Sequence, residues 1–139
     1  KRNKEESTMI NWNNLDTLTS FKELSEVERV NLAEVMSGEN GAERVKDYSI
    51  PMTEDLTYNY AAKAVDDKVL AALAKLAKEA QLTEKYAALY NGEVINTGEK
   101  RLVLHQLTRG QLGDKVEADG VDKREFYVKQ QQRIADFAN

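Results

Sequence analysis

The chain has 139 residues, of which 41% are hydrophobic and 32% are charged, and its formal net charge is −4. This length suits one domain with a single core, and the negative charge argues against a nucleic-acid partner, because phosphate binding needs a concentrated basic face. The lack of cysteine excludes disulfides, a thiolate nucleophile and cysteine ligands for a metal.

No segment of the sequence has the pattern of a membrane span or a signal peptide. Every apolar run is far shorter than the roughly 18 residues that a spanning helix needs, so we expect no membrane partner. The chain starts with Lys1 and stops at Asn139 within a helical pattern, and we expect it to be a piece of a longer protein. The polar residues 1–10 predict a flexible arm, and residues 11–139 a single mainly helical domain or fragment.

The first part of the chain carries signals for two helices. Apolar residues at three-residue spacing over residues 12–21 predict one short helix. Ser25 and Glu28 have the spacing of a capping box, so a second helix is expected over about 26–36. Gly38 then stands where a left-handed C-cap belongs.

The only proline and one alternating pattern indicate β structure in the middle of the chain. Pro51 forbids a helix through residues 47–55. Leu56, Tyr58 and Tyr60 alternate with polar residues, which predicts a short strand.

The strongest helical signal begins at Asp66. Apolar residues recur there at three and four positions, and seven of the ten residues from 71 to 80 are Ala or Leu. Thr83 is expected to cap a further short helix, which Asn91 and Gly92 end.

The last part of the chain predicts a turn, a buried segment and a final helix. Gly98 marks the turn, and residues 102–107 form the apolar segment. Asp122 is a plausible N-cap for a last amphipathic helix, one side of which carries Phe126, Tyr127, Gln130, Ile134 and Phe137. The expected fold class is therefore mainly α, with several short-to-medium packed helices and at most one or two short strands.

The search for chemistry gives no catalytic, substrate-binding or metal-binding residue. His105 is the only histidine, and it lies among apolar residues with no carboxylate at helical spacing to orient it. A core-edge histidine with one hydrogen-bond partner is favoured about four to one over a catalytic role. The paired glycines at 38 and 41 and at 110 and 113 favour plain turns over a phosphate loop, and one His with no Cys leaves only carboxylates for a metal.

Residues 91–109 read Asn-Gly-Glu-Val-Ile-Asn-Thr-Gly-Glu-Lys-Arg-Leu-Val-Leu-His-Gln-Leu-Thr-Arg. This segment closely resembles the phosphoglucose isomerase (glucose-6-phosphate isomerase) family, whose amino-terminal region contains Asn-Gly-Glu-x-Ile-Asn-x-Thr-Glu-x-Arg-Ala-Val-Leu-His-x-Ala-Leu-Arg. Gly98 stands where the family has Thr, and Leu102 and Leu107 replace alanines, so the local packing is expected to differ. The resemblance covers about 56–139, is specific at 91–109 and is weak before residue 50.

The resemblance implies a whole enzyme with an αβα fold that interconverts glucose 6-phosphate and fructose 6-phosphate in glycolysis and gluconeogenesis. It implies a cytoplasmic homodimer without metal or organic cofactor, in which a Glu base moves a proton between C1 and C2 of the sugar. The family's catalytic apparatus would follow Asn139, so no catalytic residue is carried over to this chain.

Three hypotheses remain open on the sequence. The chain could be the amino-terminal structural segment of such an isomerase, inactive alone, with the remainder of the isomerase chain as its partner. It could instead be a self-contained helical interaction module, which would cover the apolar surface around residues 102–107 and 126–137. A third reading, residual activity through His105, needs a positioned substrate that nothing in the sequence supplies.

Overall fold

The computed structural model describes residues 9–38, 40–110 and 114–138. The arm predicted over residues 1–10 lies almost wholly outside these described residues. The contacts of the chain divide it into two units. One unit comprises Lys1–Asn13 and Ala80–Asn139, and the other comprises Asn14–Glu79. The expectation of a single domain over 11–139 stays a prediction.

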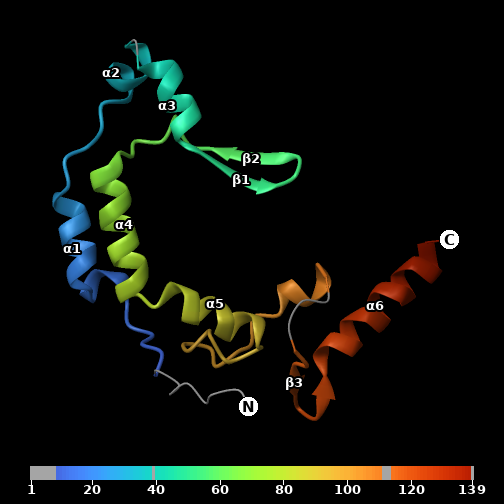
Figure 1. Ribbon diagram of the computed structural model, residues 1–139. Coiled ribbons are helices and arrows are strands. Elements are labelled where there is room, and N and C mark those ends of the chain that lie inside the picture. Colours follow the sequence, from blue (N-terminus) through green and yellow to red (C-terminus); the bar gives the residue numbers. More distant parts are fainter. Residues whose placement is uncertain (1–8, 39, 111–113, 139) are drawn as a thin grey trace, which may run out of the picture. The chain divides into compact units, whose positions relative to one another are not determined.

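The mainly α class is confirmed (Figure 1). Within the described residues there are six α-helices, two 3-10 turns and two antiparallel strand pairs, so β structure is short but slightly more frequent than expected. In the unit Asn14–Glu79 the elements are η1 (Leu15–Thr17), α1 (Thr19–Glu26), α2 (Leu32–Ser37), α3 (Gly41–Asp47), β1 (Ser49–Thr53), β2 (Leu56–Asn59) and α4 (Asp67–Glu79). In the other unit they are α5 (Leu82–Tyr90), η2 (His105–Thr108), β3 (Glu117–Ala118), β4 (Val121–Asp122) and α6 (Lys123–Ala138).

Two helix boundaries in the first part of the chain differ from the prediction. The short helix expected over 12–21 is the 3-10 turn η1 followed by α1, which begins only at Thr19. The helix expected over about 26–36 is wrong in its first turns, because α1 ends at Glu26 and α2 begins at Leu32.

Competing side-chain hydrogen bonds explain this difference. Ser25 lies in the last turn of α1, where its hydroxyl donates to the carbonyl of Lys22 at 2.6 Å instead of capping a new helix. The side chain of Asn31 accepts from the N–H of Glu34 and serves as the N-cap of α2. Gly38 follows α2 with φ −75°, so it is not a left-handed C-cap.

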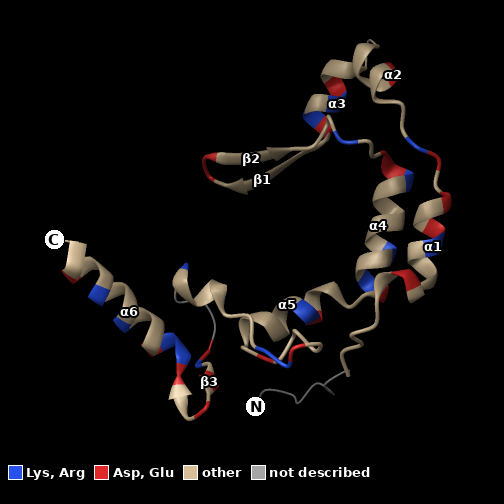
Figure 2. Cartoon of the chain, turned by 180° about the vertical axis from the view of Figure 1, so that it is seen from behind, with Lys and Arg blue, Asp and Glu red and all other residues tan. Residues whose placement is uncertain are grey.

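The predicted strand is confirmed as β2, which pairs with β1. Ile50 lies opposite Tyr58, and Pro51 opposite Thr57. Both strands of a two-stranded hairpin are edges, which is why a strand with proline is tolerated here. Figure 2 shows that the acidic residues of the hairpin gather in its turn.

Helix α4 is held at both ends by carboxylates with different partners. At its start, Asp66 accepts from the N–H of Val69 at 2.8 Å and caps the helix, whose signal was predicted to begin at this residue. At its end, Glu79 accepts from the N–H groups of Ser20 at 2.8 Å and Thr19 at 3.3 Å, which open α1. The Ser20 hydroxyl and these N–H groups, with Lys75 nearby, hold the pKa of Glu79 below its usual value. The carboxylate of Glu79 therefore caps α1, whose own N-cap residue Leu18 offers no acceptor side chain.

Arg44 ties α3 to the segment that joins β2 to α4. The residue is 9% exposed, and its guanidinium donates to the carbonyls of Ala61 at 2.9 Å, Lys63 at 3.1 Å and Val65 at 2.7 Å. The guanidinium also lies 4.1 Å from the ring centre of Tyr48, at a distance that allows cation–π attraction. One buried side chain thus fixes a segment that has no regular structure of its own.

The ends of the helices in the second unit follow the prediction in two of three places. Asn91 and Gly92 end α5, and Asp122 accepts from the N–H groups of Arg124 and Glu125 to cap α6. Thr83 is not a cap, because the helix already starts at Leu82 after the left-handed residue Gln81.

The β3–β4 hairpin was not predicted. Asp119 and Gly120 form its two-residue turn with φ of 53° and 71°, the conformation that an Asp-Gly pair favours.

Candidate functional site

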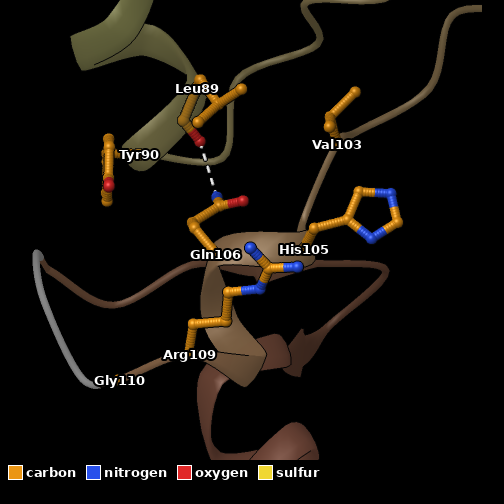
Figure 3. A pocket seen from close by; sticks show the side chains of 7 residues that line it. All are labelled: Leu89, Tyr90, Val103, His105, Gln106, Arg109 and Gly110. Atoms are coloured by element: carbon orange, nitrogen blue, oxygen red, sulfur yellow. Dashed lines mark hydrogen bonds between the residues drawn. The ribbon is translucent and has the colours of Figure 1, made fainter.

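The segment that carries the family resemblance lines a pocket of about 270 Å³ between the end of α5 and η2 (Figure 3). It is the best candidate site because it combines a concave surface with the only histidine of the chain. The lining residues are Leu89, Tyr90, Val103, His105, Gln106, Arg109 and Gly110.

A glycine and a buried apolar side chain hold the walls of this pocket in place. Gly92 has φ +72°, and a Cβ at this position would lie 2.3 Å from Cγ1 of Val116, which is buried. Only glycine therefore allows α5 to stop and the chain to turn here. Leu107 is fully buried and anchors η2.

Glutamine side chains connect η2 to the helices on either side of it. Gln106 donates from Nε2 to the carbonyl of Leu89 at 2.8 Å, across the pocket to the last turn of α5 (Figure 3). Gln131 donates to the carbonyl of Thr108 at 2.8 Å and attaches α6 to the end of η2. The pocket is thus built by local backbone turns and two amide side chains.

His105 is exposed at the start of η2, so the expectation of a core-edge histidine is wrong. The apolar residues beside it, Leu104 and Leu107, turn inward, and the 3-10 turn directs His105 outward. Figure 3 shows the side chain of Arg109 extending back along η2 toward His105 and Gln106.

The pocket offers a fixed positive charge, an imidazole and an amide. Among the described residues, no Asp or Glu lines it. An aldose–ketose isomerisation moves a proton between neighbouring carbons and needs a base positioned on that proton. These groups could attract an anion, but they supply no carboxylate base.

Two other polar residues of the same segment lie elsewhere. Asn96 and Arg101 form a backbone bridge around the turn that contains Gly98, as predicted for that glycine. The guanidinium of Arg101 lies 3.7 Å from the carboxylate of Glu99 and lines a different pocket, with Glu93 and Asp119. Arg101 and His105 therefore do not converge on one ligand.

Two further searches concern the described part of the chain. Within residues 9–38, 40–110 and 114–138, no group of three or more His, Asp or Glu side chains could hold a metal ion. In the same ranges, no helix combines the length and the apolar character that crossing a membrane requires.

Comparisons with known proteins agree with the resemblance. Residues 59–139 match the family described as phosphoglucose isomerase. The chain is 48% identical over 134 residues to glucose-6-phosphate isomerase of Treponema denticola, covering 93% of this chain and 26% of that protein. The corresponding enzyme of Treponema pallidum is 42% identical over 133 residues, and that of Borreliella afzelii 40% over 132 residues.

The extent of these matches is as informative as their identity. The alignments cover 93–94% of this chain. The similarity therefore reaches well into the part before residue 50, where the sequence motifs showed only a weak resemblance to the family. The chain spans about a quarter of the length of these curated relatives. The specific segment at 91–109 lies inside the family match, around the pocket described above. We conclude that the chain belongs to the phosphoglucose isomerase family.

Proposed function

We propose that this chain is the amino-terminal structural segment of a glucose-6-phosphate isomerase and is inactive alone. In the whole enzyme it would support the interconversion of glucose 6-phosphate and fructose 6-phosphate, in glycolysis and gluconeogenesis. The observation that carries the proposal is the coverage: the chain matches its relatives over nearly all of its own length but only about a quarter of theirs.

The geometry of the pocket supports inactivity of the isolated chain. The isomerase reaction needs a base and groups that hold a sugar phosphate, and the described lining residues provide Arg109 and His105 without a carboxylate. The chemistry would then be supplied by residues of the remaining three quarters of the enzyme. The proposal includes a cytoplasmic homodimer, a sugar phosphate substrate and no cofactor for that whole enzyme.

The surface of α6 favours a segment over a self-contained interaction module. A self-contained module would cover the apolar residues of its last helix. Instead, α6 has no buried residue, and the side chain of Phe137 is 94% exposed. An apolar helix face left in water is typical of a surface that another part of a protein covers.

A chimera tests the proposal. In it, this chain replaces the matching segment of the Treponema denticola enzyme, and conversion of fructose 6-phosphate to glucose 6-phosphate is measured for the chimera and for the isolated chain. We expect turnover by the chimera and none above background by the isolated chain. An inactive, folded chimera would contradict the role in the isomerase, and sustained turnover by the isolated chain would contradict the claim of inactivity.

A further inference from the structure

Helix α6 carries an apolar stripe that the described residues leave exposed, although the ring of Phe126 packs edge-on against that of Tyr127. Phe126, Ile134 and Phe137 fall within less than a quarter-turn of one another on the helix circumference, at the spacing i, i+8 and i+11. Their side chains are 45%, 68% and 94% exposed, and every residue from 131 to 138 is exposed. We call these three residues the α6 stripe.

The polar side of the same helix already satisfies itself. Lys129 pairs with Glu125 at 2.6 Å, and Gln132 donates to Asp136 at 2.7 Å, each across one helical turn. Figure 2 shows α6 as a mostly tan ribbon with a few Lys, Arg, Asp and Glu positions along it. These two pairs lie on the side of the helix away from the α6 stripe.

The start and the middle of α6 are fixed within their own unit. Asp122 caps the helix, and Gln131 donates to the carbonyl of Thr108 in η2. This attachment holds the helix to η2, whereas Ile134 and Phe137 of the stripe stay exposed. An isolated helix of this length is marginally stable in water, so burial of the stripe would add to its stability.

We propose that the α6 stripe is the docking surface for the rest of the isomerase chain, namely the part that lies outside the quarter of the relatives that this chain matches. This inference rests on the proposed function and goes beyond it by naming the surface. The length of the relatives indicates what covers the stripe. In relatives at 40–48% identity, the chain outside the matched segment is about three times as long as that segment. Contact within one polypeptide brings that chain to α6 at high effective concentration, whereas a second copy must be recruited from solution.

The test places a charge on the stripe and the same charge on the other side of the helix. Ile134→Glu and Phe137→Glu are introduced into the chimera, with Val128→Glu as the matched control. Val128 is 44% exposed and lies roughly opposite the stripe on α6. Circular dichroism of the isolated chain with each substitution checks that α6 keeps its helix, as its exposed position leads us to expect.

We expect each stripe variant to raise the rate of thermal inactivation of the chimera about tenfold or more, because a buried charge would face an apolar partner. Val128→Glu should change this rate less than about twofold. An active chimera in which Ile134→Glu and Phe137→Glu behave like Val128→Glu would overturn the inference and leave the proposed function standing. An inactive, folded parent chimera would overturn both.

Sedimentation of the isolated chain tests a second copy as the occupant. We expect a monomer whose state is the same with and without Ile134→Glu. Self-association that Ile134→Glu abolishes would show that a second copy covers the stripe, and the inference would be wrong.

Discussion

The helix pair α1–α4 and the helix α6 differ in where their exposed groups find partners. In the pair, the open N–H groups of α1 are satisfied by Glu79 at the end of α4, and Lys75 of α4 pairs with Glu23 of α1. In α6 two polar pairs lie along the helix itself and Gln131 donates to Thr108 of η2, while the apolar stripe is exposed. The comparison teaches that α1 and α4 satisfy polar groups of each other, whereas α6 satisfies polar groups along its own length and exposes its apolar stripe.

In the unit Asn14–Glu79, the largest loss of stability is expected from removing the side chain of Arg44. We expect Arg44→Ala to lower the free energy of unfolding by about 3–4 kcal/mol, because three backbone carbonyls lose a charged donor in a buried place. Urea denaturation of the chain measures this. Arg29→Ala removes an exposed arginine and should cost less than about 0.5 kcal/mol. Equal effects of the two substitutions would contradict the anchoring role of Arg44.

The next largest effect is expected at the end of α5. Gly92→Ala places a side chain at φ +72° and against Val116, and we expect a loss of about 2–3 kcal/mol in the same denaturation experiment. Gly98→Ala is the matched control, because Gly98 has no positive φ and its Cβ would meet only Oδ1 of Asn96 at 3.8 Å. A wild-type stability for Gly92→Ala would show that the turn can be rebuilt without glycine.

The link between α1 and α4 should depend on pH through Glu79. Its pKa is lowered in the folded chain, so its contribution is present above the unfolded value of 4.5 and is lost as the pH falls through the folded pKa. We expect Glu79→Gln to reduce stability at neutral pH and to flatten the acid limb of the pH profile. Glu84→Gln, at an exposed position in α5, serves as the control. If Glu79→Gln left the acid limb of the stability profile unchanged, Glu79 would not be the cap of α1.

The smallest effect is expected at His105. Because its side chain is exposed, His105→Ala should change the free energy of unfolding by less than about 0.5 kcal/mol, and not by the 1–2 kcal/mol that a core-edge histidine would lose. Thermal unfolding of the two proteins decides between these values. A loss above about 1 kcal/mol would place His105 in a contact that its exposure does not suggest.

Which contacts could be predicted from the sequence depended on how far apart the interacting residues lie along the chain. The caps Asp66 and Asp122 were predictable because each acceptor lies two or three residues from its donors. The cap of α1 was not, because Glu79 lies 59 residues after Ser20, and a side chain so far along the chain leaves no local pattern. The targets of Arg44 are 17 to 21 residues away in a segment without periodicity.

The candidate site shows the same limit. The motif at 91–109 indicated the family but predicted no pocket, and the structure shows that Val103, His105 and Arg109 of this segment line one. The exposure of His105 could not be read from its apolar neighbours, because a 3-10 turn and not a strand or α-helix sets which side chains face inward. The β3–β4 turn did carry a usable signal in Asp119 and Gly120, which are a favoured hairpin pair.

Hydrogen exchange of α6 tests the central claim most directly, namely that this helix needs a partner outside the chain. The amides of residues 131–138 are compared between the isolated chain and the chimera with the Treponema denticola enzyme. We expect exchange in the chimera to be at least about a hundredfold slower, because burial of the stripe suppresses local opening of the helix. Equal exchange rates in the two proteins would contradict the account.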